Sequence, residues 1–284
     1  MSYDYLRFPG FREKALTLSY DDGTVHDIRL ADTLSRNGIK STFNLNSPRL
    51  GRSGMITRED VVEHFVKKGH EVAVHGMDHF PLAAVPAVAA LRDVLEDRIV
   101  LEEITGGIVR GVAYSFGSYD DSVIAMLKAC DMAYARTTIA TEDFQIPSDW
   151  FRMPTTCHHA NPHLWELVDR FLETAPKSEY YWLHAPKLFS VWGHSYEFDL
   201  ADNWEIIETF AEKVGNRDDV WYATNMEIYE YVKAYDSLVF SADHRLVYNP
   251  SAIDVCFSDL GQTDVFVPAG KTVSLGCKES FAKM

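Results

Sequence analysis

The chain has few cysteines, and none of them belongs to a CxxC pair. The four positions are Cys130, Cys157, Cys256 and Cys277. This spacing argues against a cysteine-based zinc motif or a dithiol redox site. We expect four reduced thiols in or near the core, as is usual for a protein that is not stabilised by disulfides.

Basic residues are also scarce. The sequence has 27 Lys and Arg residues against 42 Asp and Glu residues, for a formal net charge of −15 at pH 7. Proteins that bind nucleic acids need clustered basic side chains, so the composition predicts no nucleic-acid partner. It also argues against anionic membranes and polyanionic substrates, whereas neutral or cationic ligands are compatible with it.

Long apolar runs, repeats and low-complexity tracts are absent too. Residues 1–18 show no basic segment followed by an apolar stretch. We therefore predict no signal peptide and no transmembrane helix, and a cytoplasmic location is the default expectation.

What the sequence does contain is a regular alternation of strand and helix patterns. Strands are expected at residues 15–20, 41–46 and 71–75, with helices between them at 25–37 and 57–68. The alternation continues to residue 236, with a long loop expected at 141–160. It predicts an α/β fold, a distorted (β/α) barrel of about seven strands over residues 1–236.

The pattern changes after residue 236. Residues 237–284 contain short strand-like stretches and turns, with no helix between them. We expect a small C-terminal antiparallel β appendage, which either shapes the cleft or mediates a homo-oligomer.

Polar side chains collect at the predicted strand ends. Asp21 and Asp22 end the first strand in SYDDG, His75 follows the third strand, and His79 comes four residues later in HGMDH. In a (β/α) barrel such strand ends form the active site. One carboxylate with two histidines is a familiar ligand set for a catalytic divalent cation, which would also offset the repulsion between the two aspartates. The other carboxylate is then free to act as a general base.

SYDDG and HGMDH, in this order and at this separation, resemble the motifs [TS][FY]DDG and H[ST]xxH of polysaccharide deacetylases of the carbohydrate esterase family 4 type. The resemblance covers about residues 14–235, with Gly76 in place of the usual Ser or Thr. It implies that Asp21 is the catalytic base and that Asp22, His75 and His79 hold a divalent metal. Zn²⁺ is the first expectation for this metal, with Co²⁺, Ni²⁺ and Mn²⁺ as alternatives.

The family's third motif, RPPYG, is matched only by AYSFG at residues 113–117. The resemblance implies that the backbone N–H of Phe116 helps to bind the oxyanion. The motif arginine is replaced by Ala113, and we hypothesise that Arg152 reaches Asp21 instead; the alternative is a surface arginine. Asp149-Trp150 resembles the fourth motif, which implies that Trp150 walls the pocket.

A general acid is needed for the departing amine, and histidine titrates in the right range. His194 in VWGHSYEF is favoured over His184 in WLHAP, because a strand precedes it and a helix and a last strand follow. Trp192 is a candidate to stack on a sugar ring or to pack in the wall. His158 and His159 are expected either to bind substrate or to be solvated.

Together these features predict a metal-dependent hydrolase that removes an acetyl group from an N-acetylated, or O-acetylated, sugar. One alternative is another C–N hydrolase on the same scaffold, such as one that opens a ureide. A second alternative is a carbohydrate-binding protein that has lost catalysis. The expected partner is a carbohydrate or a small amide.

Overall fold

The structure is a computed structural model of the whole chain, and it describes residues 3–173, 185–259 and 263–275. Its main feature is a nine-stranded sheet in the order β7-β6-β5-β4-β3-β2-β9-β8, with β10 paired to β2. All of these pairings are parallel. The strands are β2 (Lys14–Asp21), β3 (Thr42–Leu45), β4 (Glu71–Val74), β5 (Gly111–Ala113), β6 (Tyr134–Ala140), β7 (Met153–Thr155), β8 (Cys157–His158), β9 (Lys187–Gly193) and β10 (Val220–Tyr222).

The two ends of this strand order are joined by one short stretch of chain. Only Thr156 separates β7, which pairs with β6, from β8, which pairs with β9. The N–H of Thr156 also donates to the carbonyl of Ser190 at 2.8 Å. The sheet therefore closes into a distorted barrel, which confirms the predicted fold class. The prediction of a long loop at 141–160 is wrong in part, because this range contains the two closing strands β7 and β8.

Alternation along β2 separates the helix-facing side of the barrel from its interior. All eight residues of β2 are buried. Leu16, Leu18 and Tyr20 belong to the core that packs under the surrounding helices. Since successive strand residues point to opposite faces, Asp21 points into the barrel. A strand buried on both faces is typical of parallel sheets.

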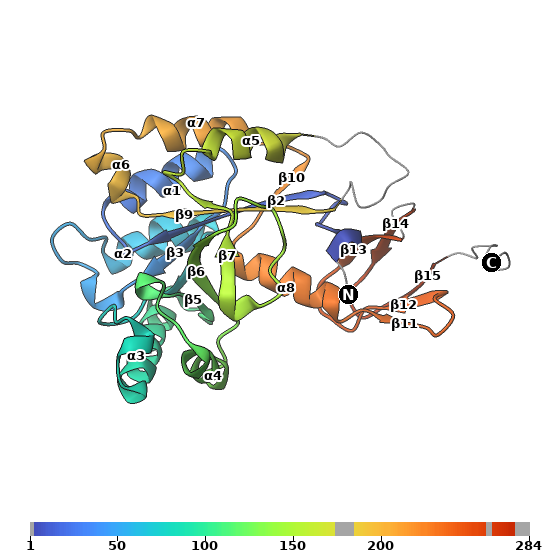
Figure 1. Cartoon of the computed structure of the whole chain (residues 1–284), viewed down its shortest axis with the longest axis horizontal. Coiled ribbons are helices and arrows are strands. Elements are labelled where there is room, and N and C mark those ends of the chain that lie inside the picture. The colour runs from blue at the N-terminus through green and yellow to red at the C-terminus, as the bar shows by residue number, and fades with distance from the viewer. Residues whose placement is uncertain (1–2, 174–184, 260–262, 276–284) are drawn as a thin grey trace.

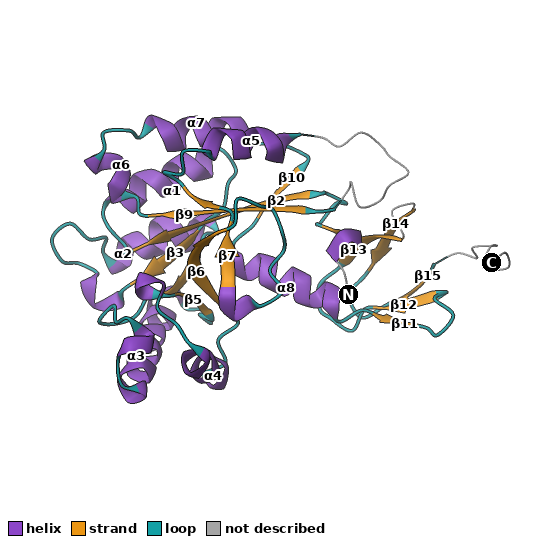
Figure 2. Cartoon of the chain, viewed as in Figure 1, coloured by secondary structure: helices purple, strands orange, loops and turns teal. Residues whose placement is uncertain are grey.

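Helices cover the barrel in two groups. In Figure 1, α1, α6, α5 and α7 lie together along one side, while α3 and α4 lie on another. Figure 2 shows the barrel strands enclosed between these groups. The α-helices are α1 (His26–Arg36), α2 (Arg58–Asp60), α3 (Ala87–Thr105), α4 (Asp121–Ala129), α5 (Leu164–Leu172), α6 (Tyr196–Leu200), α7 (Glu205–Val214) and α8 (Asn225–Asp236). Short 3₁₀ or π segments are η1 (Tyr3–Tyr5), η2 (Ser47–Arg49), η3 (Val61–Phe65), η4 (Val66–Lys68), η5 (Leu82–Ala84), η6 (Ser115–Gly117) and η7 (Trp150–Arg152).

Helix α8 joins the barrel to the C-terminal strands through a second core. Its Thr224 cap and Glu227 form a reciprocal capping box. The Tyr231 hydroxyl donates to the carbonyl of Arg7 at 2.6 Å and accepts from the N–H of Cys256 at 2.9 Å. The tyrosine thus links the first and last parts of the chain.

The C-terminal region forms two small antiparallel sheets. One has the order β1-β13-β14 and the other β11-β12-β15. The first includes β1 from the N-terminal end of the chain, so this sheet is not built from residues after 236 alone. The division into domains at residue 236 stays a prediction. The strands are β1 (Leu6–Arg7), β11 (Val239–Phe240), β12 (Leu246–Tyr248), β13 (Val255–Asp259), β14 (Thr263–Val267) and β15 (Thr272–Ser274).

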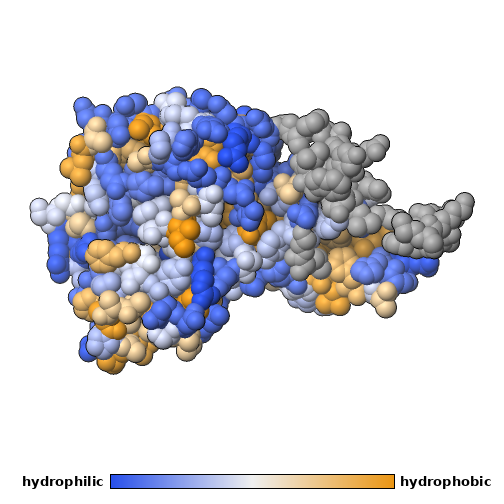
Figure 3. All heavy atoms as spheres, in the orientation of Figure 1, coloured by the Kyte–Doolittle hydropathy of each residue, from blue (hydrophilic) through white to orange (hydrophobic). Residues whose placement is uncertain are grey.

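The surface is mainly polar on the face shown in Figure 3, with hydrophobic residues in small patches and in one larger patch over the C-terminal strands. Among the described residues, none of the helices combines the length and the apolar character needed to cross a bilayer.

Candidate active site

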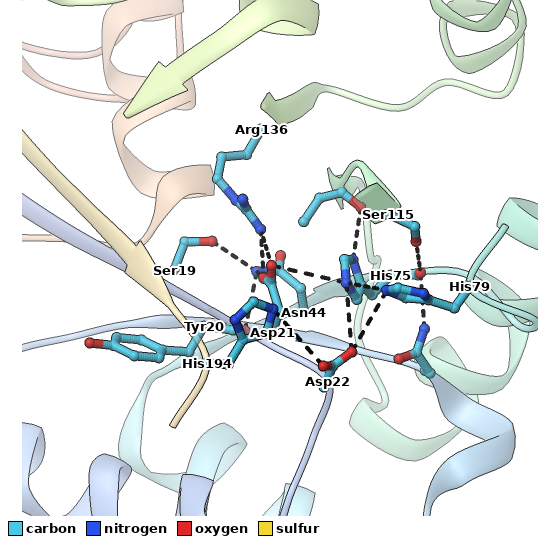
Figure 4. A network of polar contacts seen from close by, with 12 residues as sticks. Ser19, Tyr20, Asp21, Asp22, Asn44, His75, His79, Ser115, Arg136 and His194 are labelled. Carbon is cyan, nitrogen blue, oxygen red and sulfur yellow. Dashed lines mark hydrogen bonds and ion pairs between the residues drawn. The ribbon is translucent and has the colours of Figure 1, made fainter. Parts of the chain in front are cut away.

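The predicted aspartates and histidines converge at the carboxyl ends of the barrel strands. Asp21 is the last residue of β2, Asp22 follows it, and His75 comes directly after β4. Figure 4 shows these side chains pointing toward one another, together with His79 and His194. Strand ends are where a (β/α) barrel carries its chemistry.

Asp22, His75 and His79 form a candidate divalent-cation site. The Nε2 atoms of the two histidines lie 3.1 Å apart. Each Nε2 lies 3.8 Å from Asp22 Oδ1. Ligands of a tetrahedral ion at normal bond lengths are separated by roughly 3.3 Å, so the spacing fits such an ion.

The ring nitrogens of His75 and His79 that face each other are both available to bind a cation. His75 Nδ1 lies 2.9 Å from the carbonyl of Ala113, to which it donates, and this leaves the Nε2 lone pair facing His79. Burial, and then the nearby His75, lower the pKa of His79 to about 4. His79 is therefore neutral near pH 7, as a metal ligand must be.

The backbone around this site is unusual. Asp22, His79 and Phe116 all have positive φ angles, of 83°, 56° and 58°. Non-glycine residues rarely adopt this conformation, and such strain tends to collect at functional sites. The Phe116 ring is 71% exposed and lies edge-on to His79 at 4.5 Å. The role of the Phe116 N–H at an oxyanion stays a prediction.

Asp21 is held by Arg136, a residue that the sequence analysis missed. Arg136 Nη2 lies 2.6 Å from both carboxylate oxygens of Asp21. Asn44 Nδ2 donates to the same carboxylate at 2.8 Å. Burial by itself raises the pKa of Asp21, but the Arg136 charge, then His75 and His194, outweigh it and lower the pKa overall. Asp21 is thus ionised and able to accept a proton.

The hypothesis that Arg152 reaches Asp21 is wrong. The Arg152 guanidinium is 43% exposed and pairs with Asp149 at 2.5 Å and with Asp121. Arg152 is the last residue of η7, and these two ion pairs hold its side chain on the surface. Arg136, in the middle of the strand AYARTTIA, was a detectable signal, since a buried arginine requires an anionic partner.

Trp150 does not line the pocket either, which corrects a second expectation. It is 5% exposed, belongs to the second core and packs edge-on against Tyr229 of α8 at 5.2 Å. It precedes β7, whereas the candidate site gathers residues at the strands' carboxyl ends. Trp192, at the end of β9, does lie beside the site. Its ring centroid is 4.8 Å from the Arg136 guanidinium carbon, and its sugar-stacking role stays a prediction.

His194 reaches the site from the loop after β9. Its Nε2 lies 4.0 Å from Asp22 Oδ2, and its Nδ1 lies 3.1 Å from Glu197 Oε1. Burial by itself lowers the pKa of His194, but the Glu197 contact, with Asp21 and Asp22, raises it above the ordinary value. The ring is therefore suited to carry a proton on the side that faces the site. The alternative acid, His184, lies outside the described residues.

Glu197, another residue that the sequence analysis missed, is surrounded by three histidines. Its Oε2 lies 3.2 Å from His158 Nε2 and 3.0 Å from His159 Nε2. His158 Nδ1 accepts the N–H of Ala160 at 3.1 Å, so the proton of the neutral ring lies on Nε2 and points to Glu197. His158, His194 and Glu197 lie close enough together to be ligands of one metal ion. A protonated Nε2, however, has no lone pair with which His158 could bind a metal there. His158 and His159 thus support Glu197 behind the site.

Comparisons with known proteins show which family part of the chain resembles. Residues 9–135 match the family model described as Polysaccharide deacetylase. Over these residues, somewhat less than half of its length, the chain is similar to that family. It is 30% identical over 138 residues to YheN of Bacillus subtilis, a polysaccharide deacetylase by assignment only, covering 47% of each chain. It is 26% identical over 137 residues to a chitin deacetylase of Pestalotiopsis sp, covering 46% of this chain and 44% of that one. The chain thus spans about half the length of these curated relatives.

Two solved structures share the fold of this chain. A Mycobacterium smegmatis protein assigned as a polysaccharide deacetylase superposes with a TM-score of 0.59 at 16% identity, over 82% of this chain and 94% of that chain. An allantoinase named PuuE superposes with a TM-score of 0.58 at 14% identity, over 79% of this chain and 92% of that chain. The arginine beside Asp21 comes from β6 in this chain, whereas Ala113 stands where the motif RPPYG has its arginine.

Proposed function

We propose that this protein is a metal-dependent hydrolase that removes the acetyl group from an N-acetylated sugar. The observation that carries the proposal is the convergence of Asp22, His75 and His79 beside the Asp21–Arg136 pair, with His194 on the opposite side. The relative from Pestalotiopsis, a chitin deacetylase, supports a sugar substrate. The acidic composition is compatible with a neutral glycan.

The residues have distinct proposed roles. A divalent cation held by Asp22, His75 and His79, most readily Zn²⁺, would polarise the acetamide carbonyl and lower the pKa of water. Asp21, kept ionised and oriented by Arg136, accepts the proton of the attacking water. The new C–O bond forms at the carbonyl carbon, and the Phe116 N–H is proposed to donate to the oxyanion.

Collapse of the tetrahedral carbon then breaks the C–N bond. His194 Nε2 gives its proton to the departing nitrogen, while Nδ1 remains hydrogen-bonded to Glu197. The products are acetic acid, which loses its proton to solvent as acetate, and a free amine. A proton then passes from Asp21 to solvent and another returns to His194, which restores both groups.

The experiment is acetate release from an N-acetylglucosamine oligomer. The protein is treated with a chelator, assayed, reloaded with Zn²⁺ or Co²⁺ and assayed again. We expect activity to disappear and return, and an Asp22→Asn variant to stay inactive after reloading. The exposed Arg152→Met variant serves as the matched control and keeps wild-type activity.

Two further substrates separate the alternatives. Allantoin tests the ureide-hydrolase reading, and an O-acetylated sugar tests ester cleavage. Hydrolysis of allantoin without acetate release would replace the proposed substrate class. Oligomer binding with no hydrolysis of any substrate by the Zn²⁺-loaded protein would support the non-catalytic alternative.

A further inference from the structure

The segment from His75 to His79 carries two of the three candidate cation ligands, yet it is not a regular helix or strand. It contains two residues with positive φ, Gly76 at 90° and His79 at 56°. Its conformation therefore depends on contacts from other parts of the chain.

Asp97 of α3 supplies one such contact. It is 0% exposed. Its Oδ2 accepts the N–H groups of His75 at 3.2 Å and Gly76 at 3.0 Å, and its Oδ1 accepts the N–H of Ser47 at 2.7 Å. Hydrogen bonds to an ionised acceptor are stronger than neutral ones. One carboxylate thus ties the end of β4 and the loop after β3 to α3.

Asp93, one turn earlier on α3, holds the next part of the segment. Residues four apart share a helix face, so both carboxylates point to the same loop. Asp93 Oδ1 accepts the N–H of Asp78 at 2.6 Å, and its backbone carbonyl accepts the N–H of Met77 at 3.0 Å. A Cβ atom on Gly76 would lie 2.2 Å from Asp93 Oδ2. The position of the Asp93 carboxylate therefore leaves no room for a side chain at residue 76.

The carbonyl side of the same peptides is held as well. Asn46 Nδ2 donates to the carbonyls of His75 at 2.9 Å and Gly76 at 2.6 Å. The Ser115 hydroxyl donates to the His75 carbonyl at 2.7 Å. With both the N–H and C=O groups engaged, the peptide plane between His75 and Gly76 is fixed, and with it the direction of the His75 side chain.

We propose that Asp97, assisted by Asp93, is a positioning residue that sets the geometry and affinity of the cation site through the backbone of His75 and Gly76. The inference rests on the proposed function, because it assumes that Asp22, His75 and His79 bind a cation. Neither carboxylate is a catalytic residue. Their effect is expected in metal binding before it is seen in the chemical step.

The test measures Zn²⁺ affinity by competition with a chromophoric chelator, together with the visible absorption of the Co²⁺-loaded protein. Asp97→Asn replaces a carboxylate oxygen with an NH₂ group that cannot accept a hydrogen bond. We expect roughly a 10–100-fold loss of Zn²⁺ affinity, typical of outer-shell changes, and an altered Co²⁺ spectrum. Glu96→Gln is the matched control, since Glu96 is on the same helix, 44% exposed and paired with Arg92. It keeps the wild-type affinity.

The outcomes are separable from those of the proposed function. Wild-type affinity and spectrum in folded Asp97→Asn overturn the inference while leaving the cation site intact. Failure of the wild-type protein to bind Zn²⁺ or Co²⁺ removes the proposed function and the inference with it. If Asp97→Asn does not fold, Asp93→Asn, which weakens the contacts with the N–H groups of Asp78 and Phe80, decides in the same assay. Unchanged Zn²⁺ affinity in that variant overturns the inference.

Discussion

Replacing Arg136 with methionine is expected to destabilise the protein by about 3 kcal/mol at pH 7. The Arg136 and Asp21 side chains are only 1% and 3% exposed, so water cannot replace the lost partner. Removing one member of a buried ion pair costs about 3–5 kcal/mol, because the other charge stays buried. We take the lower end, since Asn44 still donates to Asp21.

The pH dependence provides an independent check. The folded-state pKa of Asp21 is lowered, so its ionisation contributes stability above the unfolded value of about 4. That stability is lost as the pH falls through the folded pKa. In Arg136→Met the Asp21 carboxyl protonates more easily, because the arginine charge that lowers its pKa is gone. The stability difference between wild type and variant should therefore shrink between pH 7 and pH 4.

The assay is urea unfolding of the cation-free proteins at both pH values, read as the free energy of unfolding. Arg152→Met is the matched control and should cost under about 1 kcal/mol, as exposed pairs do. Adding Asp21→Asn to Arg136→Met should recover part of the loss. The reasoning fails if Arg136→Met costs no more than Arg152→Met, or if the two changes at the pair are additive.

Three further predictions concern other parts of the molecule. His194→Gln should lower kcat for acetate release by about 10²–10⁴-fold, with little change in Zn²⁺ affinity, and a kcat within a factor of three would exclude it as the acid. Gly76→Ser should lower the melting temperature and the Zn²⁺ affinity, because the serine Cβ would lie 2.2 Å from Asp93 Oδ2. A melting temperature equal to that of the wild type would contradict this. Burial raises the pKa of Glu71 to about 7, so wild-type stability should fall as the pH rises from 5 to 8. Urea unfolding should show this slope reduced in Glu71→Gln and kept in the exposed-residue control Glu212→Gln.

The cation ligands were predictable because they follow strands directly. A strand pattern that ends in SYDDG and another that ends before HGMDH place their last residues at one edge of a parallel sheet, whatever the details of packing. His194 was predictable for the same reason, since it follows β9 directly.

Arg136 and Glu197 were not found because their roles depend on partners distant in the sequence. Arg136 looks like one polar residue of a strand until β6 is placed across the barrel from β2. Glu197 looks like an exposed carboxylate until α6 brings it against His158 and His159. The predictions for Arg152 and Trp150 were wrong for the opposite reason. They rested on a local likeness to a motif, which does not show which side chains are buried.

Local patterns, which depend on residues a few positions apart, were therefore enough to specify the alternating elements, the barrel and the strand ends that carry Asp22, His75 and His79. The choice of Arg136 over Arg152, and the contacts of Asp97 with the segment after β4, were decided only by the closed barrel. Electrostatic pairing and backbone hydrogen bonding act over a few ångströms in space, and only tertiary packing determines which distant residues come that close.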